Sequence, residues 1–278
     1  MAAKKSSDAK YTKWLLKLFL GGIVFIFTML LFSGLGFFGK LPSFEELENP
    51  ENNLATEIIS SDGKTLGKFY RENRTPVKYR ELPPDLIKAL IATEDERFYE
   101  HSGIDARGTA RAIVALGSKG GASTITQQLA KRLFTSWERT FGRKALEAIL
   151  ALQIEKRFTK EEILEMYFNQ IYFGHGCHGV AAASKFFFHK NVKYLSVIES
   201  SVLAGLPTRP NALSPVKYPR RAMTKNRDTL NRMVDQGYID RKKADRIYEE
   251  FWPAFVDSII MDYPTKTARS KFNDKAPY

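Results

Sequence analysis

The chain of 278 residues is long enough for one large domain or two small ones with a substantial hydrophobic core. Hydrophobic residues make up 44% of it and charged residues 27%, so the composition excludes a collagen-like or largely disordered protein. The single cysteine, Cys177, excludes an internal disulfide framework, and the formal net charge of +12 predicts an anionic partner such as nucleic acid, an acidic membrane surface or a phosphorylated substrate.

The first predicted element is a membrane-spanning helix over residues 18–39. These 22 residues carry no charge, and as a helix they span roughly 33 Å, enough for the hydrocarbon core of a bilayer. The run is too long for the apolar region of a cleavable signal peptide, and a buried core helix is disfavoured because so long an uncharged run beside a terminus is hard to bury. Lysines precede the run and glutamates follow it, so we expect residues 1–17 to form a cytoplasmic tail and the remainder to face outward.

After the anchor, an acidic and turn-rich stretch over residues 40–53 is typical of a linker. Two β-prone runs then lie on either side of Asp62-Gly63, and an Asp-Gly pair between such runs predicts a hairpin. From residue 84 onward the hydrophobic pattern is helical. The sequence therefore predicts a mainly α domain over residues 54–250 with a small N-terminal β element, and a linker over residues 251–278, where the periodicity is lost.

An acidic residue, Glu94, falls on the apolar face of the helix predicted to begin near residue 85. Burial disfavours the charged form of a carboxyl group and raises its pKa, which suits a proton acceptor or donor working near neutral pH. The alternative is a frayed helix end that exposes this acid beside Asp95 and Glu96. The residues that define the apolar face are Leu86, Ile87, Leu90 and Ile91.

The next predicted helix follows the glycine pair Gly120-Gly121. Thr124 and Gln127 fit the T-x-x-Q capping box, and glycines ahead of a helix start let a ligand approach free backbone N–H groups. The pattern indicates an anion site, with an ordinary capped helix after a loop as the alternative. A group of cations follows this site, and such a group would suit a bound pyrophosphate. The alternative is a basic face that contacts only solvent. The cations are Lys131, Arg132, Arg139, Arg143 and Lys144.

A second acid, Glu147, lies on an otherwise apolar line with Ala151, Ile154 and Phe158. Two acids placed in this way indicate a shared cleft, whereas the alternative for Glu147 is a surface ion pair with Arg143. Aromatic residues between the preceding cations suit the headgroup level of a membrane, and nucleic acid is disfavoured because an outward-facing domain rarely meets it.

The pair His175 and His178 has only two residues between its members, and no second paired cluster of metal ligands accompanies it. A zinc site is therefore disfavoured, and a glycine-rich loop is the preferred interpretation.

Four segments, in this order, closely resemble the motifs of glycosyltransferase family 51, the peptidoglycan glycosyltransferase domains of class A penicillin-binding proteins. The resemblance runs from about residue 54 to about residue 238. A fifth, arginine-rich motif of the family corresponds only loosely to residues 220–230. The four segments are 94–103 (EDERFYEHSG), 121–131 (GASTITQQLAK), 143–147 (RKALE) and 160–174 (KEEILEMYFNQIYFG).

The resemblance implies a mostly helical, lysozyme-like glycosyltransferase domain on one transmembrane helix. The implied activity is the polymerisation of lipid II, the lipid-linked disaccharide-pentapeptide, into β-1,4-linked glycan with inversion and release of undecaprenyl pyrophosphate. The implied location is the bacterial inner membrane, with a cytoplasmic N-terminus and an extracytoplasmic catalytic domain. The implied partners are lipid II, the growing glycan strand, the membrane and cell-wall synthesis proteins, and nucleic acid is not among them.

The resemblance also implies two catalytic glutamates. Glu94 would be the general base that takes the proton from the 4-hydroxyl of the acceptor sugar. Glu147 would assist the departure of undecaprenyl pyrophosphate, together with Arg143, Lys144 and Lys131 or with a bound divalent cation such as Mg²⁺ or Mn²⁺. No organic cofactor is expected.

Further positions match the substrate-binding residues of the family. Ser123, Thr124, Gln128 and Arg139 match positions around the pyrophosphate and the sugar. Asp95, Phe98 and His101 match positions that shape the first pocket, and Asn169 matches the floor of the cleft.

Two other functions stay open from the sequence. A membrane-anchored lytic murein hydrolase would also use a catalytic glutamate in a lysozyme-like fold, but it does not need cations beside a pyrophosphate. A non-catalytic anchor would recruit cell-wall proteins through its basic surface. In class A proteins a transpeptidase domain follows, and residues 251–278 resemble the linker toward it.

Overall fold

The structure of the chain is a computed structural model. It describes residues 76–114, 123–134 and 141–262, two strands within residues 56–69, and a number of positions between residues 11 and 32. The helical body that carries the candidate site therefore comes from the three longer stretches.

The predicted membrane anchor is described only in part. Every described position between residues 11 and 32 is helical and exposed. Among the residues that the structure describes, no helix is long and apolar enough to cross a membrane. The predicted linker over residues 40–53 and most of the predicted anchor lie outside the described residues, so both stay predictions.

The predicted N-terminal β element is confirmed. Strand β1 (Thr56–Ile59) pairs antiparallel with β2 (Thr65–Phe69), with Thr56 opposite Phe69 and a register irregularity between Ile58 and Ile59. The two strands flank the Asp62-Gly63 pair from which the hairpin was expected.

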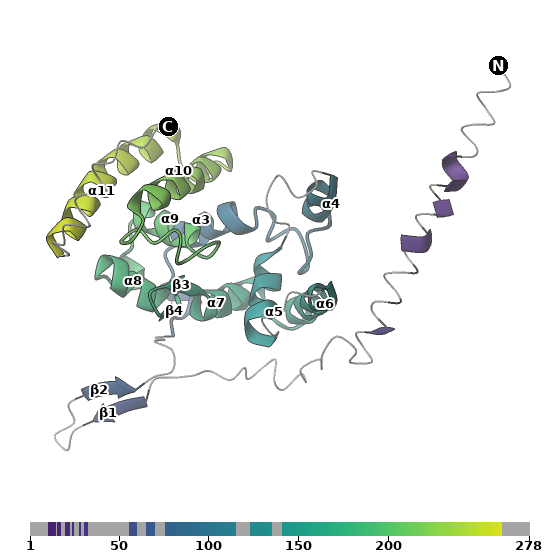
Figure 1. Cartoon of the computed structure of the whole chain (residues 1–278), viewed down its shortest axis with the longest axis horizontal. Coiled ribbons are helices and arrows are strands. Elements are labelled where there is room, and N and C mark those ends of the chain that lie inside the picture. Colours follow the sequence, from purple (N-terminus) through teal and green to yellow (C-terminus); the bar gives the residue numbers. More distant parts are fainter. Residues whose placement is uncertain are drawn as a thin grey trace.

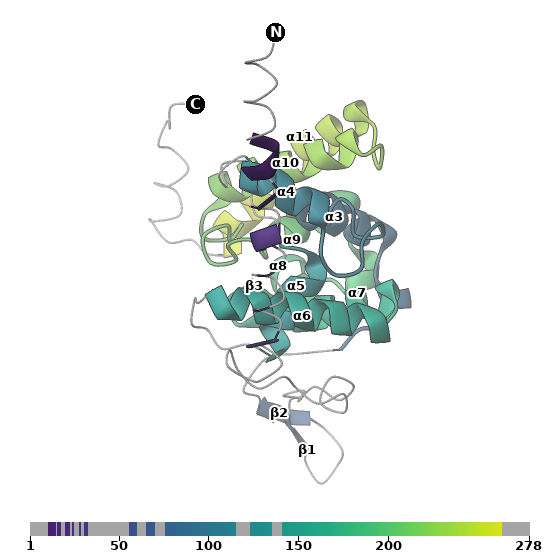
Figure 2. The ribbon, with the colours of Figure 1, turned by 90° about the vertical axis from the view of Figure 1, so that its right-hand side faces the viewer.

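The rest of the described chain is mainly α-helical, as predicted. Figures 1 and 2 show the helices in two groups, with α3, α9, α10 and α11 on one side and α5, α6 and α7 on the other. The elements after β2 are η1 (Tyr79–Glu81), α3 (Pro84–Glu94), α4 (Ala106–Val114), α5 (Ile125–Phe134), α6 (Phe141–Arg157), α7 (Lys160–Gln170), β3 (Tyr172–Gly174), β4 (Cys177–His178), α8 (Val180–Phe188), η2 (Val192–Tyr194), α9 (Val197–Gly205), α10 (Pro219–Asp235) and α11 (Arg241–Asp262).

Helix α9 is the central helix of the first group, because it packs against α3, α8, α10 and α11. It begins at a capping box, in which the Ser196 hydroxyl accepts from the Glu199 amide and the Glu199 carboxylate accepts from the Ser196 amide. Its small residues allow close approach of α10. A Cβ atom added at Gly205 would lie 3.0 Å from Cγ of Lys225 on that helix.

The last helix extends further than the sequence indicated. Helix α11 continues to Asp262, so the predicted domain boundary at residue 250 falls inside it. Trp252 is buried, and its Nε1 donates to Oδ1 of Asn226, while Nδ2 of Asn226 donates to Ser201 Oγ. The indole thus joins α11 to α10 and α9. The sequence pattern missed this because the contact depends on one aromatic side chain rather than on a long periodic stripe.

Candidate active site

A cleft of about 310 Å³ lies where the two groups of helices meet, and Glu94 is on its wall. We call it the Glu94 cleft. Five of the residues predicted from the sequence line it, from the end of α3 and the start of α5. Its full lining is Ala92, Thr93, Glu94, Asp95, Glu96, Asp105, Gly108, Arg111, Ser123, Thr124, Gln128, Thr208, Lys225 and Arg232.

Glu94 is the last residue of α3 and is half-buried, whereas the apolar residues of its helix face are buried. One carboxylate oxygen, Oε2, accepts a hydrogen bond of 2.9 Å from Nε2 of Gln128, and the other, Oε1, accepts one of 3.0 Å from the hydroxyl of Thr208. Both donors are uncharged side chains. The carboxylate is therefore held in place from two sides and still borders the cleft.

The amide of Gln128 is oriented by Tyr167, whose hydroxyl donates to Oε1 of Gln128 at 3.1 Å. Burial raises the pKa of Tyr167 well above its ordinary value, and the charges of Glu94 and Asp95 raise it further. The phenol therefore stays protonated and acts as a donor. Because it occupies the amide oxygen, the amide nitrogen is directed at Glu94.

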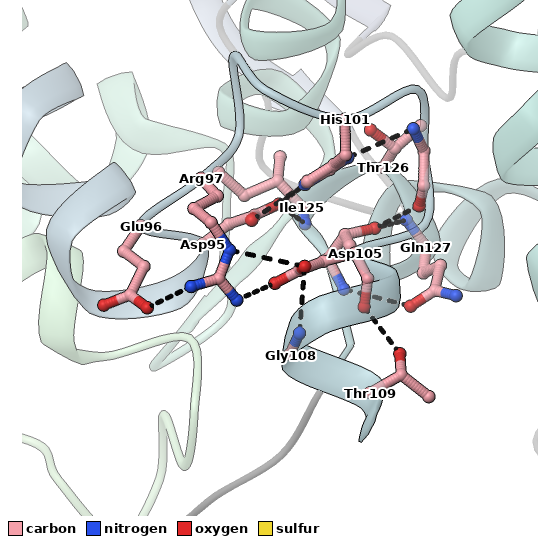
Figure 3. A network of polar contacts seen from close by, with 12 residues as sticks. Asp95, Glu96, Arg97, His101, Asp105, Gly108, Thr109, Ile125, Thr126 and Gln127 are labelled. Carbon is pink, nitrogen blue, oxygen red and sulfur yellow. Dashed lines mark hydrogen bonds and ion pairs between the residues drawn. The ribbon is translucent and has the colours of Figure 1, made fainter. Parts of the chain in front are cut away.

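Asp95 is buried and joins three parts of the site, as Figure 3 shows. Its Oδ2 accepts from the backbone amide of Ile125 at 3.0 Å, and its Oδ1 contacts Nε2 of His101 at 3.0 Å. The other ring nitrogen of His101 accepts from the Gly103 amide, which assigns the proton to Nε2. A negative charge at the first amide of α5 is favoured by the helix dipole. Asp95 therefore fixes α5, and with it Gln128, relative to Glu94.

The capping box predicted at the start of α5 is present. The hydroxyl of Thr124 accepts from the Gln127 amide at 3.1 Å, and Oε1 of Gln127 accepts from the Thr124 amide at 3.0 Å. The Thr124 hydroxyl also donates to the carbonyl of Gly103 at 2.7 Å. Thr124 is thus a buried residue with a structural role at the base of the cleft, and the half-buried Ser123 lies beside it on the wall.

A second polar network joins residues that line the cleft, and Figure 3 shows its members Glu96, Arg97 and Asp105. The guanidinium of Arg97 pairs with both Asp105 and Glu96, and Arg111 pairs with the same oxygen of Glu96 at 3.2 Å. Burial opposes the charge of Asp105, but hydrogen bonds from Arg97 and the Gly108 amide outweigh it and lower the pKa of Asp105. Asp105 therefore stays ionised and holds the start of α4 in position at the cleft.

Glu147 lies on α6, which packs against α5, and its side chain is only 2% exposed. Its carboxylate pairs with Nε of Arg143 at 3.0 Å and with Nζ of Lys144 at 2.6 Å. The ion pair with Arg143 is therefore real but buried, and the alternative of a surface pair is wrong. Lys144 also donates to Ser123 Oγ at 3.4 Å, which joins this cluster to the wall of the Glu94 cleft.

Position 103, in the turn between α3 and α4, requires glycine. Its φ is +91°, and an added Cβ would lie 2.8 Å from the carbonyl oxygen of Ala151. We expect Gly103→Ala to lower the free energy of unfolding by about 2–4 kcal/mol, through left-handed strain and overpacking. Denaturant unfolding measures the change. Gly237→Ala is the matched control, since Gly237 also has a positive φ but nothing within 4 Å of an added Cβ. Equal losses for the two variants would contradict the steric part of this account.

Three predicted site residues lie elsewhere. Phe98 is fully buried, and Nζ of Lys160 lies 4.2 Å from the centre of its ring, so it supports the site from the core. His101 acts on Asp95 and is absent from the described lining of the cleft. Asn169 exchanges two hydrogen bonds with the backbone of Val77 and so holds the segment before α3; it is not among the described residues of the cleft floor or wall.

The other cations of the predicted group do not share one environment. Lys131 is exposed on α5, three residues after Gln128 and hence on the same face of the helix. Arg132 instead donates to the carbonyl of Gln170 and pairs with Nδ1 of His178. Arg139 lies outside the described residues.

Several cleft residues were missed by the sequence analysis. Thr208 follows α9, and Lys225 and Arg232 come from α10, where only a loose family motif was seen. Lys225 and Arg232 lie seven residues apart, about two helical turns, so their spacing is the signal that was available. Which cleft they would face was not contained in that spacing.

Metal ligands do not gather in the described part of the chain, where no group of three or more His, Cys, Asp or Glu residues is suitably placed for a metal ion. Both oxygens of Glu147 already face cations. The described residues therefore do not fit a divalent ion at Glu147, and the cations beside this carboxylate are those of Arg143 and Lys144.

Comparison with known proteins adds a family and several relatives. A family model described as Transglycosylase matches residues 62–234. The chain is 45% identical over 196 residues to penicillin-binding protein 1F of Bacillus subtilis, covering 69% of this chain and 28% of that protein. It is 43% identical over 215 residues to penicillin-binding protein 1A of Escherichia coli, covering 76% of this chain and 25% of that protein. The chain thus spans about a quarter to a third of the length of such relatives.

Among solved structures, the chain is similar to the crystal structure of penicillin-binding protein 1A from Haemophilus influenzae. The sequence identity is 26% and the TM-score 0.43, over 72% of this chain and 21% of that chain.

Proposed function

The chain belongs to the transglycosylase family, and on that premise we propose that it is a peptidoglycan glycosyltransferase that polymerises lipid II. The observation that carries the proposal is Glu94, a carboxylate on the wall of a cleft that is also lined by Arg111, Lys225 and Arg232. In the structure Arg111 pairs with Glu96, and Lys225 and Arg232 both pair with Asp228, so a diphosphate would share these cations with the carboxylates. A base and a set of cations in one cleft suit a reaction between a sugar hydroxyl and a sugar diphosphate.

In the proposed reaction, Glu94 takes the proton from the 4-hydroxyl of the acceptor sugar. The freed oxygen forms a bond to the anomeric carbon of the donor, and the bond from that carbon to the pyrophosphate oxygen breaks. The electron pair leaves with undecaprenyl pyrophosphate. Attack from the face opposite the leaving group turns the α-linked donor into a β-1,4 linkage.

We assign Glu147 to the leaving group through its two cations. Its single negative charge faces Arg143 and Lys144, so the cluster keeps one net positive charge beside Ser123. The side chain of Lys144 is 53% exposed and is the member that can reach a phosphate, while the buried Glu147, itself paired with Arg143, contacts its ammonium group. Lys131 and Arg139 are proposed to extend this positive region along the lipid pyrophosphate.

We also propose that residues 18–39 anchor the domain in the inner membrane, with the catalytic part on the outer side. The uncharged run and the lysines before it support this placement. Apolar side chains are exposed at described positions between residues 11 and 32, among them Leu20, Val24 and Leu31, and this is consistent with a lipid environment.

The direct test is incubation of the detergent-solubilised chain with labelled lipid II, followed by gel separation of the products. We expect glycan polymer. Shortening of finished glycan with no polymer would indicate a lytic hydrolase instead. Binding of lipid II with neither product would indicate a non-catalytic anchor.

A further inference from the structure

The loop between α9 and α10, residues 206–218, brings one side chain to Glu94 from outside the four motif segments. Leu206, the first residue after α9, is buried, and the Arg209 amide donates to its carbonyl at 3.1 Å. Thr208 lies inside this turn, and its hydroxyl donates to Oε1 of Glu94 at 3.0 Å. The two residues are 114 positions apart in the sequence.

The hairpin formed by β3 and β4 holds this loop at three points. The hydroxyl of Tyr172 donates to Oδ1 of Asn211 at 3.3 Å. Gly174 has a φ of +95°, and an added Cβ would lie 3.0 Å from the carbonyl oxygen of Pro210. Nε2 of His175 lies 2.7 Å from the hydroxyl of Ser214.

The contact between His175 and Ser214 is the more deeply buried of the two hydrogen bonds. Ser214 is fully buried, and its oxygen also accepts from the Lys217 amide at 3.1 Å. The His175 ring stacks on Phe186, with ring centres 4.9 Å apart, and meets Phe187 edge-on at 5.8 Å. Burial lowers the pKa of His175, and the charge of Lys217 lowers it further, so the ring is neutral near pH 7. The histidine is therefore held by α8 on one side and holds the loop on the other.

We propose that Thr208 is a positioning residue for the Glu94 carboxylate, and that the β3–β4 hairpin fixes the loop that presents it. This inference rests on the proposed role of Glu94 as the base. With Gln128 at Oε2 and Thr208 at Oε1, the carboxylate cannot rotate without losing a hydrogen bond. A hydroxyl that both donates and accepts can also stay bonded while the acceptor sugar approaches.

The test compares Thr208→Val, which keeps the shape but removes the hydroxyl, with Thr208→Ser, which keeps the hydroxyl. We expect Thr208→Val to lower kcat of lipid II polymerisation about tenfold with little change in KM. Thr208→Ser should remain within about threefold of the unmodified chain. An unchanged kcat in Thr208→Val, an equal loss in Thr208→Ser, or a change in KM alone would overturn the positioning role.

The hairpin is tested with Ser214→Ala, alone and combined with Thr208→Val, with thermal unfolding of each variant to correct for the folded fraction. We expect Ser214→Ala to lower kcat about threefold and to add nothing in the double variant, because both act through one hydroxyl. Additive losses would overturn the link between the hairpin and Thr208. The unmodified chain and Glu94→Gln, assayed in parallel, keep the two levels apart. No polymer from the unmodified chain would overturn the proposed function, and activity retained in Glu94→Gln would overturn the role of Glu94 as the base. An inactive Glu94→Gln beside a fully active Thr208→Val would overturn only the present inference.

Discussion

Glu94→Gln is expected to abolish polymerisation of lipid II, with a loss of at least about a hundredfold, while the protein stays folded and still binds lipid II. The amide has almost the shape of the carboxylate and can still accept a hydrogen bond from Gln128 or Thr208. It cannot take a proton from the acceptor hydroxyl. Turnover on labelled lipid II and binding of lipid II measure the two properties separately.

The control for this variant is Glu250→Gln, the same chemical change at an exposed position of α11. It should polymerise at the rate of the unmodified chain. Retained turnover in Glu94→Gln would remove the general-base assignment, and loss of lipid II binding would show that the residue serves the substrate rather than the proton.

Glu147→Gln is expected to lower kcat about a hundredfold and also to destabilise the protein. The substitution leaves the buried Arg143 without its negative partner, and breaking a buried ion pair by removing one member costs about 3 kcal/mol or more. Without the carboxylate, Lys144 is no longer held against Ser123. The rate should therefore fall even when it is counted per folded molecule.

Glu199→Gln separates the two effects. Glu199 is also buried and pairs with a lysine, Lys190, at 2.7 Å, but it caps α9 and is absent from the described lining of the cleft. It should lose stability without losing activity per folded molecule. If Glu147→Gln behaves in the same way, Glu147 is structural and its role at the leaving group is wrong.

The local parts of the site could be predicted from the sequence because they depend on neighbours in the chain. The capping box of Thr124 and Gln127 needs only residues three apart, and it forms as expected. The apolar face of α3 required only helical periodicity, and it brings Glu94 to the edge of the core. In both cases a short-range pattern determined the geometry.

The long-range parts could not be predicted in this way. Thr208 reaches Glu94 from a loop between two prolines, and nothing in the periodicity of either segment links them. Asn169 belongs to a family motif, yet its side chain forms two hydrogen bonds with the backbone of Val77. The two residues are 92 positions apart in the sequence, so only the folded structure shows that they are in contact. The resemblance to a family identified the position but did not give its contacts.

The closeness of α9 and α10 at Gly205 connects the interior of the protein to the charge of the Glu94 cleft. Lys225 borders the Glu94 cleft, and its stem passes over the one position where α9 has no side chain. Any larger residue at position 205 would push that stem aside and relocate a positive charge that a diphosphate would meet. A substitution at the buried position 205 would then change the affinity for an anionic ligand, although this position does not line the cleft. Ranking positions by their distance from the ligand would overlook it.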